Sequence, residues 1–150
     1  MPPFDPDAIQ HPRRRRFFEY WRSKQRNNAF PGRADIDPLE FPWALGYVSL
    51  YDVLADGEFR CRLDATNAAM FFDNDLTGTW LSAHCNLAIG AMMVATFTHV
   101  VGIRAPLLAS RDLLVQNRVW RYQSLVLPFA ADGEKVDMVA SVLSYDGGGD

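Results

Sequence analysis

A few side chains in the sequence are of types that could carry out chemistry. Cys61 and Cys85 are the only cysteines, and two isolated cysteines in a domain of this size are more typical of free buried thiols than of a disulfide. Asp73 and Asp75 precede a helical stretch, where helix capping explains them better than acid–base catalysis. The sequence has no Gly-x-Ser-x-Gly elbow, HExxH helix, phosphate-binding loop or Cys/His cluster with metal-ligand spacing. We therefore predict a protein without enzymatic activity and without a bound metal.

The charged residues are unevenly spread along the chain. The 150 residues carry a formal net charge of −3, yet residues 1–33 hold eight Lys or Arg against three Asp or Glu. The run from Arg13 to Arg16, followed by Phe17, Phe18 and Trp21, could bind a nucleic acid or a membrane surface, because bases and interfaces accept aromatic rings beside cations. The acidic remainder favours a different interpretation, in which an amphipathic helix packs its aromatic stripe on the domain or on a second copy.

The composition is that of an ordinary globular protein. Hydrophobic residues make up 49% and charged residues 22%, and the length suits one domain with its own core. Residues 80–103 contain no Asp, Glu, Lys or Arg, but His84, Asn86 and two threonines dilute this run, which favours a buried helix over a membrane span. The arginine run is not followed by the apolar region of an export signal, so we predict a cytoplasmic protein.

Hydrophobic periodicity and turn residues predict an α+β fold. Residues 1–12 hold four prolines and form an irregular arm, and an N-terminal amphipathic helix occupies 13–30, with its helical turns over 13–27. The later elements are strands at 45–54 and 58–66, short helical pieces between 67 and 85, a helix at 86–103, and strands at 107–115, 118–129 and 136–145. The simplest packing is a five-stranded antiparallel sheet with helices on one face and an extra N-terminal helix.

Several short motifs occur in a characteristic order along these elements. They are Tyr20-Trp21, the run from Pro31 to Pro38, Leu50-Tyr51-Asp52-Val53, the run from Phe59 to Leu63, and Asp75-Leu76-Thr77-Gly78. Together with the element order they resemble the PAS domain, and more specifically a bacterial branch of that superfamily often found as single-domain proteins. The resemblance covers residues 17–145. The chain departs from this branch at Ala65-Thr66, Asp73 and Thr79, which concerns loop conformation and ligand preference more than the fold.

The resemblance implies a non-enzymatic sensory or signalling domain. We expect a PAS-like domain at 31–146 and a flexible tail at 147–150. Such a domain binds a small ligand in its core cavity, a protein partner, or both, and we expect its signal to pass to a separate signalling protein. In PAS proteins an N-terminal helix commonly supports dimerisation. This implies a homodimer with an interface formed by Phe17, Phe18 and Trp21.

The helix at 86–103 is expected to cover the inner face of the sheet. At about 100° per residue, bulky side chains from Ile89 to Ile103 fall on one face, and small residues fall on another. The bulky face can form an ordinary core or line a cavity for a small apolar ligand, and the sequence leaves both open. The candidate cavity residues are Phe59, Leu63, Met92, Phe97, His99, Trp120 and Tyr122.

We expect no cofactor in this cavity. Some PAS domains hold haem through a histidine on the corresponding helix, which here is His99, but a lone histidine on an apolar helix is more typical of a boundary residue. Flavin-binding relatives carry a reactive cysteine in an Asn-Cys-Arg-Phe-type run, which residues 83–87 do not match. The best enzyme alternative is a hot-dog thioesterase, but the central helix offers no Asp or Glu to act on a thioester.

Overall fold

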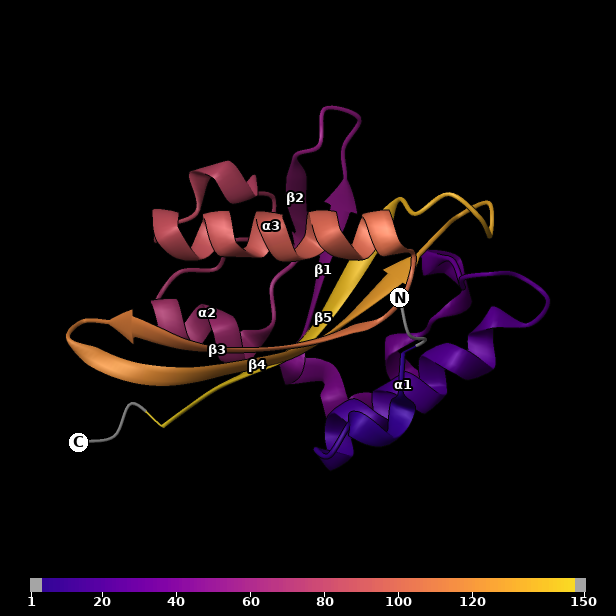
Figure 1. The fold of residues 1–150 in the computed structure, drawn as a ribbon, viewed down its shortest axis with the longest axis horizontal. Coiled ribbons are helices and arrows are strands. Elements are labelled where there is room, and N and C mark those ends of the chain that lie inside the picture. The colour runs from indigo at the N-terminus through magenta and orange to yellow at the C-terminus, as the bar shows by residue number, and fades with distance from the viewer. Residues whose placement is uncertain (1–3, 148–150) are drawn as a thin grey trace.

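The computed structural model describes residues 4–147 as a five-stranded sheet with helices on both faces (Figure 1). The strands lie in the order β2-β1-β5-β4-β3, and all neighbours are antiparallel. The strands are β1 (Val48–Val53), β2 (Phe59–Leu63), β3 (Leu107–Val115), β4 (Arg118–Phe129) and β5 (Met138–Gly147). The helices are α1 (Pro12–Gln25), α2 (Thr66–Phe72) and α3 (Leu87–Ile103). The predicted α+β class and five-stranded antiparallel sheet are confirmed.

The register of the strands separates two faces of the sheet. The ring centre of Phe97 on α3 lies 4.8 Å from that of Tyr51 on β1, and we call the face that carries Tyr51 the inner face. Val139 of β5 lies opposite both Tyr51 and Pro128. Directly opposite residues point to the same side of a sheet, so the even-numbered residues of β4 belong to the inner face and the odd-numbered ones to the outer face.

Helix α1 packs on the outer face, opposite α3 (Figure 1). Pro12 begins the helix, where its missing N–H costs nothing, and His11 caps it by accepting a hydrogen bond from the Arg13 backbone N–H at 3.2 Å. The Trp21 indole N–H donates to the carbonyl of Pro128 at 2.9 Å. The expectation of helices on one face therefore describes α2 and α3, and the extra helix covers the other side.

Helix α3 spans the inner face and turns its bulky side chains inward. Met93, Phe97 and Val100 are buried, and the small residues of the opposite face, such as Ala91 and Gly102, are exposed. This is the arrangement that the residue periodicity predicts. The helix ends at Ile103, and its C-cap residue, Arg104, adopts the left-handed conformation with φ 56°.

Two of the predicted strands are shorter in the structure. The strand predicted at 45–54 begins at Val48, because Pro42–Tyr47 forms a 3-10 helix ahead of it. The strand predicted at 58–66 ends at Leu63, because α2 begins at Thr66. The predicted tail begins at Gly147, which is the last residue of β5, and its remaining residues lie outside the described part of the chain.

The two edges of the sheet differ. At β2 the backbone N–H of Cys61 donates to Thr79, and the Gly78 N–H donates to the carbonyl of Cys61, so a following segment continues the hydrogen bonding. At the other edge, β3 pairs only with β4, and that ladder ends where Leu107 meets Val126. The inner face between these edges is where the candidate ligand residues lie.

Candidate functional site

The middle of the space between α3 and the sheet is filled by aromatic side chains. Phe97 is fully buried and contacts Tyr51 and Phe59, with ring centres 4.8 Å and 5.6 Å away. Phe59 and Tyr51 are 1% and 2% exposed. Two of the predicted cavity residues, Phe59 and Phe97, are therefore packed against each other as core and do not line an open space.

A second aromatic group lies toward α2 and the β3–β4 hairpin. Tyr122 is buried, which raises the pKa of its hydroxyl, and its ring centre lies 5.2 Å from that of Tyr145. The ring centre of Phe71 on α2 lies 4.8 Å from that of Trp120 and 4.2 Å from that of Tyr145. The structure thus brings Trp120 and Tyr122 together on the inner face, through Tyr145 and α2, which the sequence reasoning did not name as site elements.

This group borders an open hollow of about 370 Å³, which we call the α2 hollow. Its lining residues come from α2, the β3–β4 hairpin and β5, and they are Asn67, Met70, Phe71, Val115, Gln116, Trp120 and Tyr145. No charged side chain is among them. The Oδ1 atom of Asn67 is buried and has no hydrogen-bond partner within the described residues. A buried polar atom without a hydrogen-bond partner lowers the stability of the fold. The α2 hollow thus has an aromatic lining and one hydrogen-bond acceptor that a ligand could satisfy.

The other predicted cavity residues do not line the α2 hollow, although Met92 also packs against the buried cluster that contains Tyr122. Met92 and His99 line a smaller hollow of about 200 Å³ at the edge of α3, where His99 is exposed. Leu63 is 43% exposed, because the β1–β2 ladder shifts register where Leu50 pairs with Leu63 and Tyr51 pairs with Cys61. The shift interrupts the alternation that predicts an inward Leu63. The seven residues therefore do not form one cavity.

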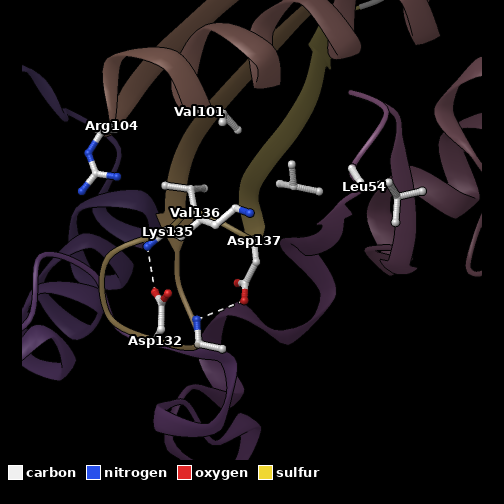
Figure 2. A pocket seen from close by; sticks show the side chains of 10 residues that line it. Leu54, Val101, Arg104, Asp132, Lys135, Val136 and Asp137 are labelled. Carbon is white, nitrogen blue, oxygen red and sulfur yellow. Dashed lines mark hydrogen bonds between the residues drawn. The ribbon is translucent and has the colours of Figure 1, made fainter.

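A larger open hollow of about 740 Å³ lies at the C-terminal end of α3, beside the β4–β5 connection (Figure 2). Val101 and Val136 supply part of its apolar lining, and Lys135 extends beside them. The carboxylate of Asp132 accepts from the Lys135 backbone N–H at 2.7 Å, and that of Asp137 accepts from the Ala131 N–H at 3.1 Å. These carboxylates thus stabilise the turn. The sequence predicts this turn but carries no signal for the hollow.

The aromatic stripe of α1 is buried by the protein itself. Phe17, Phe18 and Trp21 are at most 4% exposed and belong to the main core. They cannot touch a second copy while α1 is packed in this way, which corrects their expected role as an interface. The reason is that the outer face of the sheet is itself apolar and needs cover. A homodimer stays a prediction, and it would need another surface.

The arginine run is also engaged within the protein. The guanidinium carbon of Arg13 lies 3.5 Å from the ring centre of Tyr47, and that of Arg16 lies 4.2 Å from the Trp43 ring. Arg15 forms an ion pair with Glu19 at 3.3 Å. With the neighbouring aromatic rings buried, these contacts weigh against the nucleic-acid and membrane-surface alternatives.

The two cysteines differ in burial, and Cys85 lies beside a histidine. Both cysteines are free; Cys61 is buried as expected, but Cys85 is exposed. Burial raises the pKa of the Cys61 thiol to about 12, which opposes thiolate formation. Nδ1 of His84 already accepts the Asn86 backbone N–H at 2.9 Å, and the Cys85 sulfur lies 3.9 Å from it. Within residues 4–147, no three His, Cys, Asp or Glu side chains gather as a metal site, and no helix is long and apolar enough to cross a membrane.

Comparison with known proteins agrees with this architecture. A family model described as a PAS domain matches residues 9–144. The chain belongs to the PAS family. The PAS domain of BvgS from Bordetella pertussis is 16% identical, with a TM-score of 0.56, and the match covers 75% of this chain and 88% of that one. A domain of an HTR-like protein from Haloarcula marismortui is also 16% identical, with a TM-score of 0.50 and coverage of 67% and 98%. No curated protein matches the sequence.

These similarities establish the fold and the general role of this PAS domain. Members of the family are generally sensory or signalling domains and are typically non-enzymatic. The two structural neighbours share too little sequence to transfer a ligand or a partner.

Proposed function

We propose that this PAS domain is a non-enzymatic, cytoplasmic sensory module that binds a small neutral aromatic ligand in the α2 hollow and signals to a separate protein. The observation that carries the proposal is the buried, unpartnered Oδ1 of Asn67 beside a hollow lined by Phe71, Trp120 and Tyr145. Small-molecule sites are typically apolar, with a few polar groups that set the orientation of the ligand.

The lining of the α2 hollow defines the chemistry of the ligand. Aromatic side chains favour a flat ring, because aromatic pairs add about 0.5–1.5 kcal/mol beyond the burial of area. The amide oxygen of Asn67 calls for a hydrogen-bond donor on that ring. No charged residue lines the hollow, so an ionised ligand would lose its hydration without an opposite charge in contact with it. Arg118 lies outside the lining, with its guanidinium carbon 5.6 Å from the ring centre of Trp120. A neutral heteroaromatic compound with one N–H or O–H group fits these requirements.

Strand β5 offers a route from the α2 hollow to the opposite face of the sheet. Tyr145 lines the hollow on the inner face, and the adjacent Ser144 accepts a hydrogen bond from Arg14 of α1 at 3.1 Å on the outer face. A ligand that moves the end of β5 would therefore also change how often α1 is packed against the sheet. Such a change in population requires only that the ligand bind one arrangement better than the other.

The proposal can be tested with indole, a neutral ring with one N–H donor. We expect saturable binding in isothermal titration calorimetry, and at least a tenfold loss of affinity in Trp120→Leu and Asn67→Ala. Trp80→Leu is the matched control, because Trp80 is 45% exposed and lies outside the α2 hollow. Native mass spectrometry of freshly purified protein then searches for a retained ligand.

Either of two outcomes would contradict the proposal. One is the absence of saturable binding by indole and by a panel of neutral heteroaromatic compounds. The other is binding that Trp120→Leu and Trp80→Leu weaken equally. In both cases the domain would be better explained as a protein-interaction module with a filled core.

A further inference from the structure

We propose that Arg14 forms a second binding site on the outer face of the sheet, which takes a small monocarboxylate. This site lies on the opposite side of the sheet from the α2 hollow. It uses none of the residues that line that hollow, so the proposal does not depend on the sensory ligand.

The guanidinium of Arg14 is buried without an opposite charge in contact with it. Arg14 is 6% exposed, and it donates from Nη1 to Ser144 Oγ at 3.1 Å and from Nη2 to Gln123 Oε1 at 3.2 Å. Both acceptors are neutral. The other three arginines of the run each have an ion pair or an aromatic partner. Among residues 4–147, no carboxylate lies within 4.0 Å of Arg14. Buried charges are normally paired, because desolvation of a lone ion is costly.

The charge of Arg14 is balanced only indirectly, through a hydroxyl group that separates it from a carboxylate. Ser144 Oγ donates to Asp146 Oδ2 at 2.9 Å, so one hydroxyl group separates the Arg14 cation from an exposed carboxylate. Burial lowers the pKa of Arg14 in spite of this neighbour. A guanidinium has five N–H donors, and the two hydrogen bonds described leave others available for a ligand oxygen.

Space for such a ligand lies directly beside Arg14. A hollow of about 180 Å³ opens between the first turn of α1 and strands β3 and β4. Arg14, His11, Ser110 and Gln123 contribute to its polar lining, and Ile9 and Leu108 contribute to its apolar lining. Ser110 lies directly opposite Gln123 in the β3–β4 ladder. The hollow therefore presents one cation, neutral polar groups and an apolar patch within a small volume.

These features favour a short-chain carboxylate over a phosphate. Burial and the neighbouring arginines lower the pKa of His11, which favours its neutral form, and Arg14 is the one arginine or lysine among the lining residues. Arg121 Nη1 also lies 3.5 Å from Ser110 Oγ in the lining, but Arg121 is paired with Asp112 through its Nε at 2.7 Å. Arg13, the next cation along the helix, is stacked on Tyr47. A single carboxylate matches this charge and forms charge-assisted hydrogen bonds with a guanidinium, while a short alkyl chain can contact the apolar patch.

The test is a titration with sodium propionate at constant ionic strength, followed by two-dimensional NMR of backbone amides. We expect saturable shifts around residues 9–14 and 108–110, and no saturable shift with propionamide or inorganic phosphate. Arg14→Gln should weaken propionate binding at least tenfold. Arg16→Gln should leave it unchanged, because Arg16 lies on the same helix but is exposed.

A second variant guards against a folding defect in Arg14→Gln. Ser110→Glu adds a carboxylate to the lining of the hollow, opposite Gln123 and beside Arg121, where it can pair with the cations of this region and repel an incoming carboxylate. We expect this variant to fold, to melt at a higher temperature than the wild type, and to lose propionate binding. The proposal is overturned if propionate does not bind saturably, if phosphate binds in its place, or if propionate binds Ser110→Glu as well as the wild type.

Discussion

At the scale of single residues, the buried carboxyl of Asp64 organises the start of the helical segment. Asp64 is 7% exposed, and its Oδ2 accepts from the Leu76 backbone N–H at 3.0 Å. Ser49 Oγ lies 3.4 Å from its Oδ1 and accepts from the Ala65 N–H at 2.8 Å. Burial raises the pKa of Asp64 above its ordinary value of 3.8 in spite of these hydrogen bonds. The folded protein thus favours the neutral carboxyl more than the unfolded chain does.

The raised pKa gives a prediction with a definite sign. The stabilising contribution of Asp64 is complete below its unfolded pKa, and it is lost as pH rises through the higher folded pKa. Asp64→Asn does not titrate, so its free energy of unfolding should improve relative to the wild type as pH rises from 3.5 to 7. Urea unfolding across this range measures the difference. Parallel pH curves for the two proteins would contradict the prediction.

Asp75 is the matched control, because its pKa is shifted in the opposite direction. Its exposed carboxylate accepts the Thr77 backbone N–H at 2.9 Å, and this hydrogen bond lowers its pKa. The stabilisation by Asp75 is therefore present above its unfolded pKa and is lost as pH falls. Asp75→Asn should lose stability relative to the wild type as pH rises, opposite to Asp64→Asn.

Sequence reasoning located part of the candidate site at this scale. Trp120 and Tyr122 could be placed near the inner face from the alternation of β4, although both faces of that strand carry apolar residues. Leu63 could not be placed, because the register shift beside it leaves no mark in the hydrophobic pattern. The unpartnered Oδ1 of Asn67 depends on packing between α2 and the hairpin, which no local pattern encodes.

At the scale of elements, α3 packs closely against the preceding 3-10 turn, Leu81–Ala83, and this close approach is possible because Gly90 has no side chain. A Cβ atom at Gly90 would lie 2.7 Å from the Leu81 carbonyl oxygen and 2.7 Å from His84 Cβ. The same addition at Gly102, near the other end of the helix, would meet nothing within 4 Å. One helix therefore contains a glycine required by packing and a glycine that packing does not require.

The two glycines predict opposite effects of the same substitution. Gly90→Ala should destabilise the protein by about 1–3 kcal/mol, because an overpacked contact forces the backbone to move. Gly102→Ala should stabilise it by about 0.5–1 kcal/mol, because alanine favours an exposed helix interior. Urea unfolding of both variants measures these changes. A Gly90→Ala variant as stable as the wild type would show that the turn does not hold α3.

The elements themselves were largely predictable. Strands β3 and β4 have the predicted bounds, and α3 is one residue shorter than predicted, because the turn and capping residues at their ends are local signals. The side of the sheet on which α1 packs was not predictable, because its aromatic stripe fits any apolar surface. The 3-10 helix Pro42–Tyr47 was also missed, since the strand-like residues from Leu45 to Tyr47 hide it.

At the scale of the whole molecule, α1 is part of the core rather than an extension of it. Phe17, Phe18 and Trp21 belong to the same buried cluster as Leu125 and Leu127 of β4. The family match likewise begins ahead of the helix, at residue 9. Removal of α1 would uncover the apolar outer face of the sheet.

Deletion of residues 1–26 should therefore abolish folding to a stable monomer. We expect the shortened chain to aggregate or to lose its cooperative thermal transition, because exposed apolar surface drives association. Size-exclusion chromatography and circular dichroism distinguish these results from a folded monomer. A monomeric, cooperatively melting product would show that residues 31–146 form the domain without the helix.

The contact between Trp21 and Pro128 also limits what happens when α1 detaches. The Asp137 N–H donates to the Phe129 carbonyl, so the carbonyl of Phe129 points toward β5. Successive carbonyls of a strand point to opposite sides, so the Pro128 carbonyl points away from β5. No residue of β3 lies opposite it, because the β3–β4 ladder ends at Val126. A departing helix frees this acceptor, but proline offers no donor beside it. A foreign strand would find an incomplete template for cross-chain pairing at this point. We therefore expect Pro128 to disfavour edge-to-edge association of two chains when α1 detaches.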